Sequence, residues 1–115
     1  ISFHCKPSHD GSPIISSNEI AKMKKNALII NTARGNLVSE IDLSEAIKNE
    51  TIKGAAIDVF ANEPTKENVL FGLDNVILTP HIAASTSEAQ IIVAEMVANQ
   101  FVDYFLMDKV TNAVT

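Results

Sequence analysis

The sequence contains few cysteines, glycines and arginines, and each scarcity excludes a class of site. The single cysteine, Cys5, cannot form an internal disulfide or a multi-thiol zinc site, and the three histidines lack the short regular spacing of metal ligands. The four glycines are scattered, so no glycine-rich phosphate loop is present. We therefore expect a reducing compartment, the cytoplasm by default, and no metal site.

The sequence also lacks a long hydrophobic run and an excess of basic residues. No stretch approaches the ~18 consecutive apolar residues of a membrane span, and no targeting signal is evident at the start. Nine basic residues against fourteen acidic ones give a net charge of −5, which argues against nucleic acid as a partner. What the sequence does have is 115 residues, 46% of them hydrophobic, which suffice for one packed domain.

Four short apolar runs alternate with segments of helical pattern. The expected strands are residues 1–5, 27–31, 55–59 and 76–78, and the expected helices begin at Ser17, Glu40 and Ser87. The run at 27–31 is continuous, which predicts a strand covered on both faces. The alternation predicts an α/β fold in which right-handed crossovers connect a parallel sheet.

The last predicted helix is long and apolar. Ser85 and Glu88 have the Ser-x-x-Glu spacing of a capping box, and neither glycine nor proline follows them. We expect a helix of about five turns over Ser87–Met107. Because apolar side chains occur nearly all round it, we expect it to be covered on more than one side.

Polar or titratable residues follow each predicted strand, where parallel sheets bind ligands. Taken singly, a histidine or aspartate at a strand end is more often a solvated or capping residue than a catalyst. Four such positions at one edge of a sheet favour a site. The residues are His4 and Cys5, then Thr32, Ala33 and Arg34, then Asp58, then Thr79, Pro80 and His81.

Three of the candidate residues have complementary chemistry. Arg34 is the sequence's only arginine among nine basic residues, and its planar guanidinium suits a carboxylate, although an ordinary salt bridge to a helix is the simpler interpretation. His81 can give or take a hydroxyl proton near neutral pH, and Glu63 is placed to pair with it. Together they would bind an acid group, polarise a carbonyl and manage one proton.

Several ordered motifs give the chain a family resemblance. It resembles the D-isomer-specific 2-hydroxyacid dehydrogenases, and the end of the chain is most similar to those members that oxidise 3-phosphoglycerate to 3-phosphohydroxypyruvate in serine biosynthesis. The motifs are Ile30–Val38, Gly54–Phe60, Glu63–Pro64 and Asn75–Ile82 for the family, and Ala84–Gln90 and Asn112–Val114 for that group.

The resemblance implies roles for particular residues. Arg34 would bind the substrate carboxylate, His81 would be the acid/base, and Glu63 would stabilise the imidazolium; Asp58 would hold the carboxamide of NAD. The positions implied to line the cofactor are Cys5, Thr32, Ala33, Arg34, Asp58, His81, Ile82, Ala83 and Ala84. Ala83 departs from the glycine usual in the family.

The resemblance also implies that residues 1–115 are a single, partial, Rossmann-like domain. They would form the second half of a doubly wound NAD-binding domain, without its glycine-rich turn or a substrate domain. Such a piece is expected to be inactive alone. The partner would be a small 2-hydroxy or 2-oxo acid, and we expect a homo-oligomer, because apolar strands lacking a neighbour favour pairing with another copy. The alternatives are an enzyme for glycerate or lactate, a corepressor-like protein that senses NAD, and a structural or interaction module.

Overall fold

The structure is a computed structural model that describes residues 1–113, and it contains two compact units. Unit 1 comprises residues 1–81 and unit 2 the described residues from 82 onward. Val114, which belongs to one of the motifs of the resemblance, lies outside the described residues. The prediction of one partial domain over 1–115 stays a prediction.

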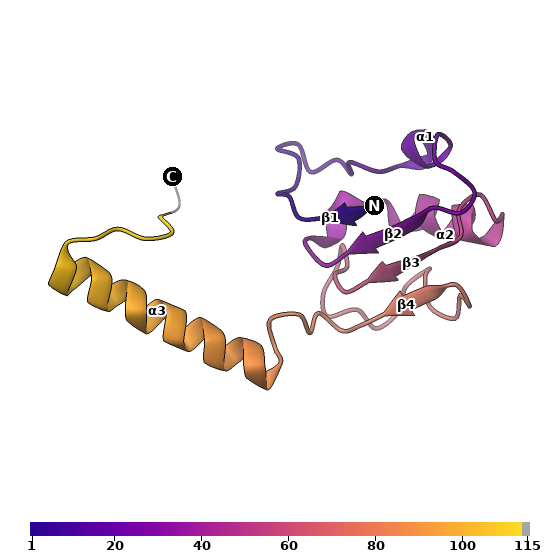
Figure 1. The fold of residues 1–115 in the computed structure, drawn as a ribbon. Helices are drawn as coiled ribbons and strands as arrows, with labels where there is room; N and C mark the ends of the chain where they lie inside the picture. Colours follow the sequence, from indigo (N-terminus) through magenta and orange to yellow (C-terminus); the bar gives the residue numbers. More distant parts are fainter. Residues whose placement is uncertain (114–115) are drawn as a thin grey trace. The chain divides into compact units, whose positions relative to one another are not determined.

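Unit 1 contains a four-stranded parallel sheet whose strands lie in the order β1-β2-β3-β4 (Figure 1). Neighbouring strands in the sheet are therefore neighbours in the sequence, and each crossover passes along the sheet in one direction. The predicted parallel α/β architecture is confirmed. The strands are β1 (Ser2–Phe3), β2 (Leu28–Asn31), β3 (Gly54–Ile57) and β4 (Val76–Leu78).

Two α-helices and one 3₁₀ turn connect these strands. Ser16 caps the first helix together with Glu19, whose carboxylate accepts from the Ser16 N–H at 3.1 Å, and Ser39 caps the second by accepting from the Asp42 N–H. Both helices were predicted, whereas the 3₁₀ turn was not. The elements are α1 (Ser17–Ile20), η1 (Gly35–Leu37) and α2 (Glu40–Lys48).

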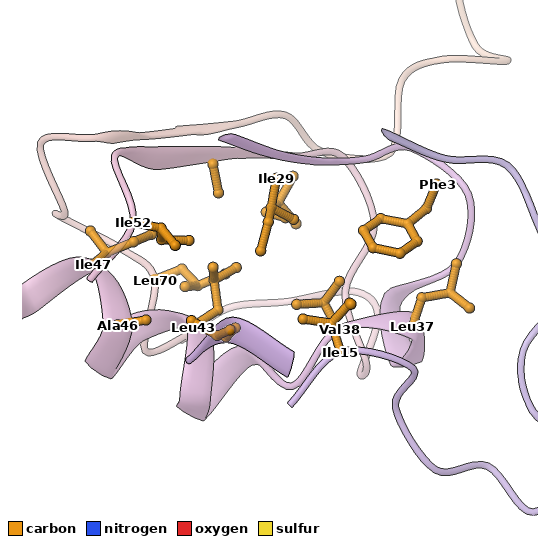
Figure 2. Close-up of a cluster of buried hydrophobic side chains, with 13 residues drawn as sticks. Phe3, Ile15, Ile29, Leu37, Val38, Leu43, Ala46, Ile47, Ile52 and Leu70 are labelled. Atoms are coloured by element: carbon orange, nitrogen blue, oxygen red, sulfur yellow. The ribbon is translucent and has the colours of Figure 1, made fainter. Parts of the chain in front are cut away.

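The core of unit 1 lies between one face of the sheet and the helices (Figure 2). Ile29 of β2 is fully buried, and Leu43 of α2 belongs to the same cluster. Ile20 of α1 and Leu70 of the loop before β4 join them. Both helices therefore pack on the same face of the sheet.

The other face of the sheet is not covered by unit 1, which corrects the prediction for 27–31. Side chains alternate along β2, so that Ile29 and Asn31 are buried while Leu28 and Ile30 are exposed. Ile77 of β4 is 69% exposed. The prediction failed because a continuous apolar run shows that both faces suit burial, but it does not show what covers them.

Unit 2 is built around α3 (Ser87–Met107), which has the predicted bounds. Its N-cap is Thr86, whose hydroxyl accepts from the Ala89 N–H at 3.2 Å, so the predicted capping box of Ser85 and Glu88 is wrong by one residue. None of its residues is buried, which also corrects the expectation of cover on more than one side. Among the described residues, no helix is long and apolar enough to cross a membrane.

Candidate active site

The carboxyl ends of the four strands lie at one edge of the sheet, because all the strands are parallel. The residues that follow them were the predicted site residues. Within unit 1 the structure brings Arg34, Glu63 and His81 to the lining of one cavity of about 320 Å³. The geometry at this edge therefore combines a guanidinium, a carboxylate and an imidazole.

A buried amide shapes the turn that carries Arg34. Asn31 ends β2 and is 1% exposed. Its Nδ2 donates to the Arg34 carbonyl at 2.9 Å, and its Oδ1 accepts from the Ala33 N–H at 3.2 Å. One side chain thus satisfies two backbone groups of residues 33–34, which fixes the turn where the strand ends.

The Arg34 guanidinium is exposed at this turn. Its Nη1 donates to the Ala33 carbonyl at 2.7 Å, and no salt bridge to it occurs among residues 1–113. Gly35 follows and touches the backbone of Phe60, because a Cβ there would lie 2.0 Å from the Phe60 carbonyl carbon and oxygen. The guanidinium therefore keeps donors for an anion, while the backbone behind it is tightly packed.

Glu63 and His81 form a pair, with Oε2 of the carboxylate 2.7 Å from Nδ1 of the ring. Oε1 accepts from the Phe60 N–H at 2.8 Å. These two hydrogen bonds, the one from His81 first, lower the pKa of Glu63 below its ordinary value. An ionised carboxylate only accepts, so Nδ1 carries the proton and a neutral imidazole keeps a lone pair on Nε2.

Asp58 follows β3 and is 4% exposed. Its Oδ1 accepts from the Thr79 hydroxyl at 2.5 Å, so the polar ends of β3 and β4 are joined through their side chains. A buried carboxylate is stable only with such donors. Asp58 is therefore a fixed acceptor at the same edge of the sheet.

A second cavity, of about 360 Å³, lies beside the first and shares Arg34 with it. Of the predicted cofactor residues, Cys5, Thr32 and Ala33 line it, together with Lys6. A cavity of this size suits one ring or sugar of a dinucleotide rather than the whole molecule. Ile82, Ala83 and Ala84 belong to unit 2, where Ser85 N–H donates to the Ile82 carbonyl at 2.9 Å.

Residues 1–83 match the family model described as "D-isomer specific 2-hydroxyacid dehydrogenase, NAD binding domain". The chain belongs to this family. The family match confirms the predicted resemblance and, at the level of the family, the prediction of NAD as cofactor.

Individual relatives agree with the family. The chain is 55% identical to D-3-phosphoglycerate dehydrogenase of Methanocaldococcus jannaschii over 87 residues, which are 76% of this chain and 17% of that protein. It is 41% identical to glycerate dehydrogenase of Methylorubrum extorquens over 117 aligned residues, covering 99% of this chain and 37% of that protein. The chain therefore spans less than two fifths of the length of these relatives.

A solved member of the family confirms the Rossmann-like fold. D-lactate dehydrogenase with NAD⁺ from Lactobacillus jensenii superposes with a TM-score of 0.80 at 27% identity, over 99% of this chain and 38% of that one. In all three comparisons the matched part of the relative is a minority of its length.

The sequence-based reasoning missed the residues that hold the family's motif residues in place. Asn31 was part of a quoted motif but was given no role, and Glu40 was considered only as the start of a helix. A polar residue that ends an otherwise apolar strand is a usable signal for Asn31, because a buried amide needs partners. No comparable signal exists for Glu40, whose partners lie 21 and 28 residues away.

Proposed function

We propose that this chain supplies the catalytic residues of an NAD-dependent dehydrogenase that oxidises a D-2-hydroxy acid. The observation that supports the proposal best is the joint lining of one cavity by Arg34, Glu63 and His81, with the imidazole paired to the carboxylate at 2.7 Å. Guanidinium, carboxylate and imidazole are the groups that such a reaction needs from the protein.

The proposed mechanism gives each side chain one task. Arg34 holds the substrate carboxylate, which places the hydroxyl group toward Nε2 of His81. Nε2 takes the hydroxyl proton and the ring becomes an imidazolium. Glu63 stabilises this cation, because its Oε2 lies 2.7 Å from Nδ1 of the ring. A bound NAD supplies the acceptor for the hydride that leaves C2.

The cofactor is proposed to occupy the second cavity, which shares Arg34 with the cavity that contains Glu63 and His81. Cys5, Thr32 and Ala33 line the cavity of about 360 Å³ there, and Asp58 offers a fixed acceptor for a carboxamide at the neighbouring strand end. His81, Ile82, Ala83 and Ala84 are proposed to complete the cofactor's surroundings. The sequence holds no glycine-rich phosphate turn, so we expect this chain alone to bind NAD weakly and to turn over no substrate.

The substrate is proposed to be 3-phosphoglycerate, which would place the enzyme in serine biosynthesis, in the cytoplasm. The support is the 55% identity to a D-3-phosphoglycerate dehydrogenase. A second candidate is glycerate, favoured by the 41% identity to a glycerate dehydrogenase over nearly the whole chain. Comparing kcat/KM for both acids in the dehydrogenase that carries this chain decides between them, and a preference for glycerate would overturn the first proposal.

The chemistry is tested in a chimera. This chain replaces the matching segment of the Methanocaldococcus jannaschii relative, and NAD reduction is followed with 3-phosphoglycerate. We expect turnover, a loss of about 10²–10⁴-fold in kcat for His81→Gln, and mainly a raised KM for Arg34→Lys, because lysine lacks the planar fork. His9→Gln is the matched control. A His81→Gln chimera that is as fast as its parent would refute the proton-transfer role.

A homo-oligomer is also proposed, supported by exposed apolar side chains on the open sheet face of unit 1 and on α3, Leu28, Ile30, Ile77, Ile91 and Phe101 among them. Light scattering of the purified chain measures the mass directly. A monomer at micromolar concentration and above would count against the proposal.

A further inference from the structure

A side chain of α2 holds the loop that carries Glu63. Glu40 is the first residue of α2, and its Oε1 accepts from the Ala61 N–H at 2.8 Å. Its Oε2 accepts from Nδ2 of Asn68, also at 2.8 Å. One carboxylate thus links the start of a helix to two points of the polar loop between β3 and β4.

The second of those points is anchored in the core of unit 1. Oδ1 of Asn68 accepts from the Leu70 N–H at 2.9 Å, and the Leu70 side chain is fully buried. Figure 2 shows Leu70 between the sheet and α2, close to Leu43. Both parts of Glu40 are therefore connected to the core of unit 1. Its backbone belongs to α2, and its carboxylate is bound to Asn68.

The first point lies next to the catalytic pair. Phe60 and Ala61 present consecutive N–H groups to two different carboxylates: Phe60 donates to Glu63 and Ala61 donates to Glu40, each at 2.8 Å. Gly35 packs against the same backbone, since an added Cβ would lie 2.0 Å from the Phe60 carbonyl carbon and oxygen. The backbone that orients Glu63 is thus fixed by Glu40 and by the absence of a side chain at position 35.

From this arrangement we propose that Glu40 is a positioning residue for the Glu63–His81 pair. It holds the Phe60–Ala61 backbone so that the Phe60 N–H and the His81 ring meet the two oxygens of one carboxylate. The proposal rests on the proposed function only in that the pair serves catalysis. No ion pair to Glu40 occurs among residues 1–113, so its carboxylate has this hydrogen-bonding task and no salt bridge.

A competing explanation is that Glu40 only stabilises α2. A carboxylate in the first turn of a helix interacts favourably with the helix dipole, and Asp42 occupies the same turn. That role would change the free energy of unfolding and leave the folded loop unaltered. The test must therefore report on Glu63 in the folded chain.

The experiment is an NMR titration of the Glu63 side-chain carboxyl carbon in the 115-residue chain. The hydrogen bonds from His81 and Phe60 lower the Glu63 pKa, so a loosened loop raises it toward the ordinary value. For Glu40→Ala we expect the titration midpoint to rise, whereas loss of the negative charge of Glu40 alone would lower it. Glu45→Ala removes the same charge from an exposed position on the same helix and should leave it unchanged.

A second variant covers the case in which Glu40→Ala does not fold. Glu40→Gln keeps the size of the side chain and one acceptor oxygen, but its amide nitrogen cannot accept from Asn68. We expect a smaller rise of the Glu63 midpoint in the same direction. A folded Glu40→Ala or Glu40→Gln chain with an unchanged Glu63 midpoint would overturn the proposal.

The titration needs neither NAD nor substrate, so its outcome is separate from that of the chimera. If the Glu63 midpoint responds to Glu40 while the chimera transfers no hydride, the positioning role stands and the proposed function falls. If the chimera is active and the midpoint does not respond, the reverse holds.

Discussion

The two units treat their apolar side chains in opposite ways. In unit 1, α2 is a mixed helix, yet it buries Leu43, Ala46 and Ile47, and it even buries Ser44, whose hydroxyl donates to the Val69 carbonyl at 3.0 Å. In unit 2, α3 is apolar round most of its circumference and buries none of its residues. Leu106 is 79% exposed and Phe105 69%.

This difference shows that burial depends on the surface available to a helix more than on its apolarity. The stripe of α2 meets a sheet face of matching pattern, in which Ile29, Ala55 and Ile57 point the same way. Unit 2 offers α3 no such surface, although burying one large apolar side chain is worth about 1.5–3 kcal/mol. Burying the exposed side chains of α3 against another surface would therefore be strongly favourable.

The largest expected effect concerns Gly35, which has no room for a side chain. Gly35→Ala would place a Cβ 2.0 Å from the Phe60 carbonyl carbon and oxygen, and backbone atoms cannot move aside cheaply. We expect a loss of more than about 4 kcal/mol in the free energy of unfolding, or no folding. Gly72→Ala, with open space around it but a positive φ, is the control and should cost about 1–2 kcal/mol in urea denaturation. Equal losses of unfolding free energy for the two variants would show that the Phe60 backbone can move away from a side chain at position 35.

The next effect compares the two helices directly. Leu43→Ala removes a fully buried side chain of α2 and should cost about 2–5 kcal/mol. Phe101→Ala removes a larger side chain, which is 57% exposed on α3. In the monomeric chain this substitution should change the free energy of unfolding by less than about 0.5 kcal/mol. Both are measured by urea denaturation at low concentration. A large cost for Phe101→Ala at every concentration would abolish the distinction between the units.

A smaller effect on stability is expected from removing the N-cap hydroxyl of one helix in each unit. Ser39 caps α2 and Thr86 caps α3, each through its hydroxyl. Ser39→Ala should lower the global free energy of unfolding by about 1 kcal/mol, because α2 belongs to the core. Thr86→Ala should reduce helical circular dichroism before the main transition and leave the urea midpoint of unit 1 in place. A common midpoint shift for both variants would mean that the units unfold together.

The smallest expected effect is the dependence of unit 1 on acid. The hydrogen bonds from His81 and Phe60 lower the pKa of Glu63, so their stabilisation is complete above the ordinary glutamate pKa of about 4.3 and is lost as the pH falls through the lowered value. His81→Ala should therefore make stability fall less steeply with acid below that pH. The difference is small, because both side chains are partly exposed. Urea midpoints at several pH values test it, with His9→Ala as control.

The positions of the helices and strands could be predicted from the sequence better than the burial of their faces. The bounds of α3 and the position of β4 follow from local patterns, since helix caps and apolar runs are properties of a few consecutive residues. Whether Leu28 and Ile30 are covered depends on residues far along the chain or outside it. No local pattern carries that information.

The candidate site was predictable where chemistry is visible in the residue type. Arg34, Glu63 and His81 stand out as a guanidinium, a carboxylate and an imidazole near strand ends, and the structure brings them to one cavity. The supporting contacts were not predictable. Glu40 reaches Ala61 and Asn68 only because α2 packs beside the loop, and Gly35 matters only because Phe60 passes against it.

The order of the strands has a consequence for synthesis. Because β2, β3 and β4 each lie beside the strand that precedes them in the sequence, the neighbour of each of these three strands is already made when it leaves the ribosome. No strand waits for a later one to fill a gap between itself and its predecessor. The sheet can grow one strand at a time at its advancing edge, so a nascent chain exposes only one newly made unpaired strand at that edge at any moment.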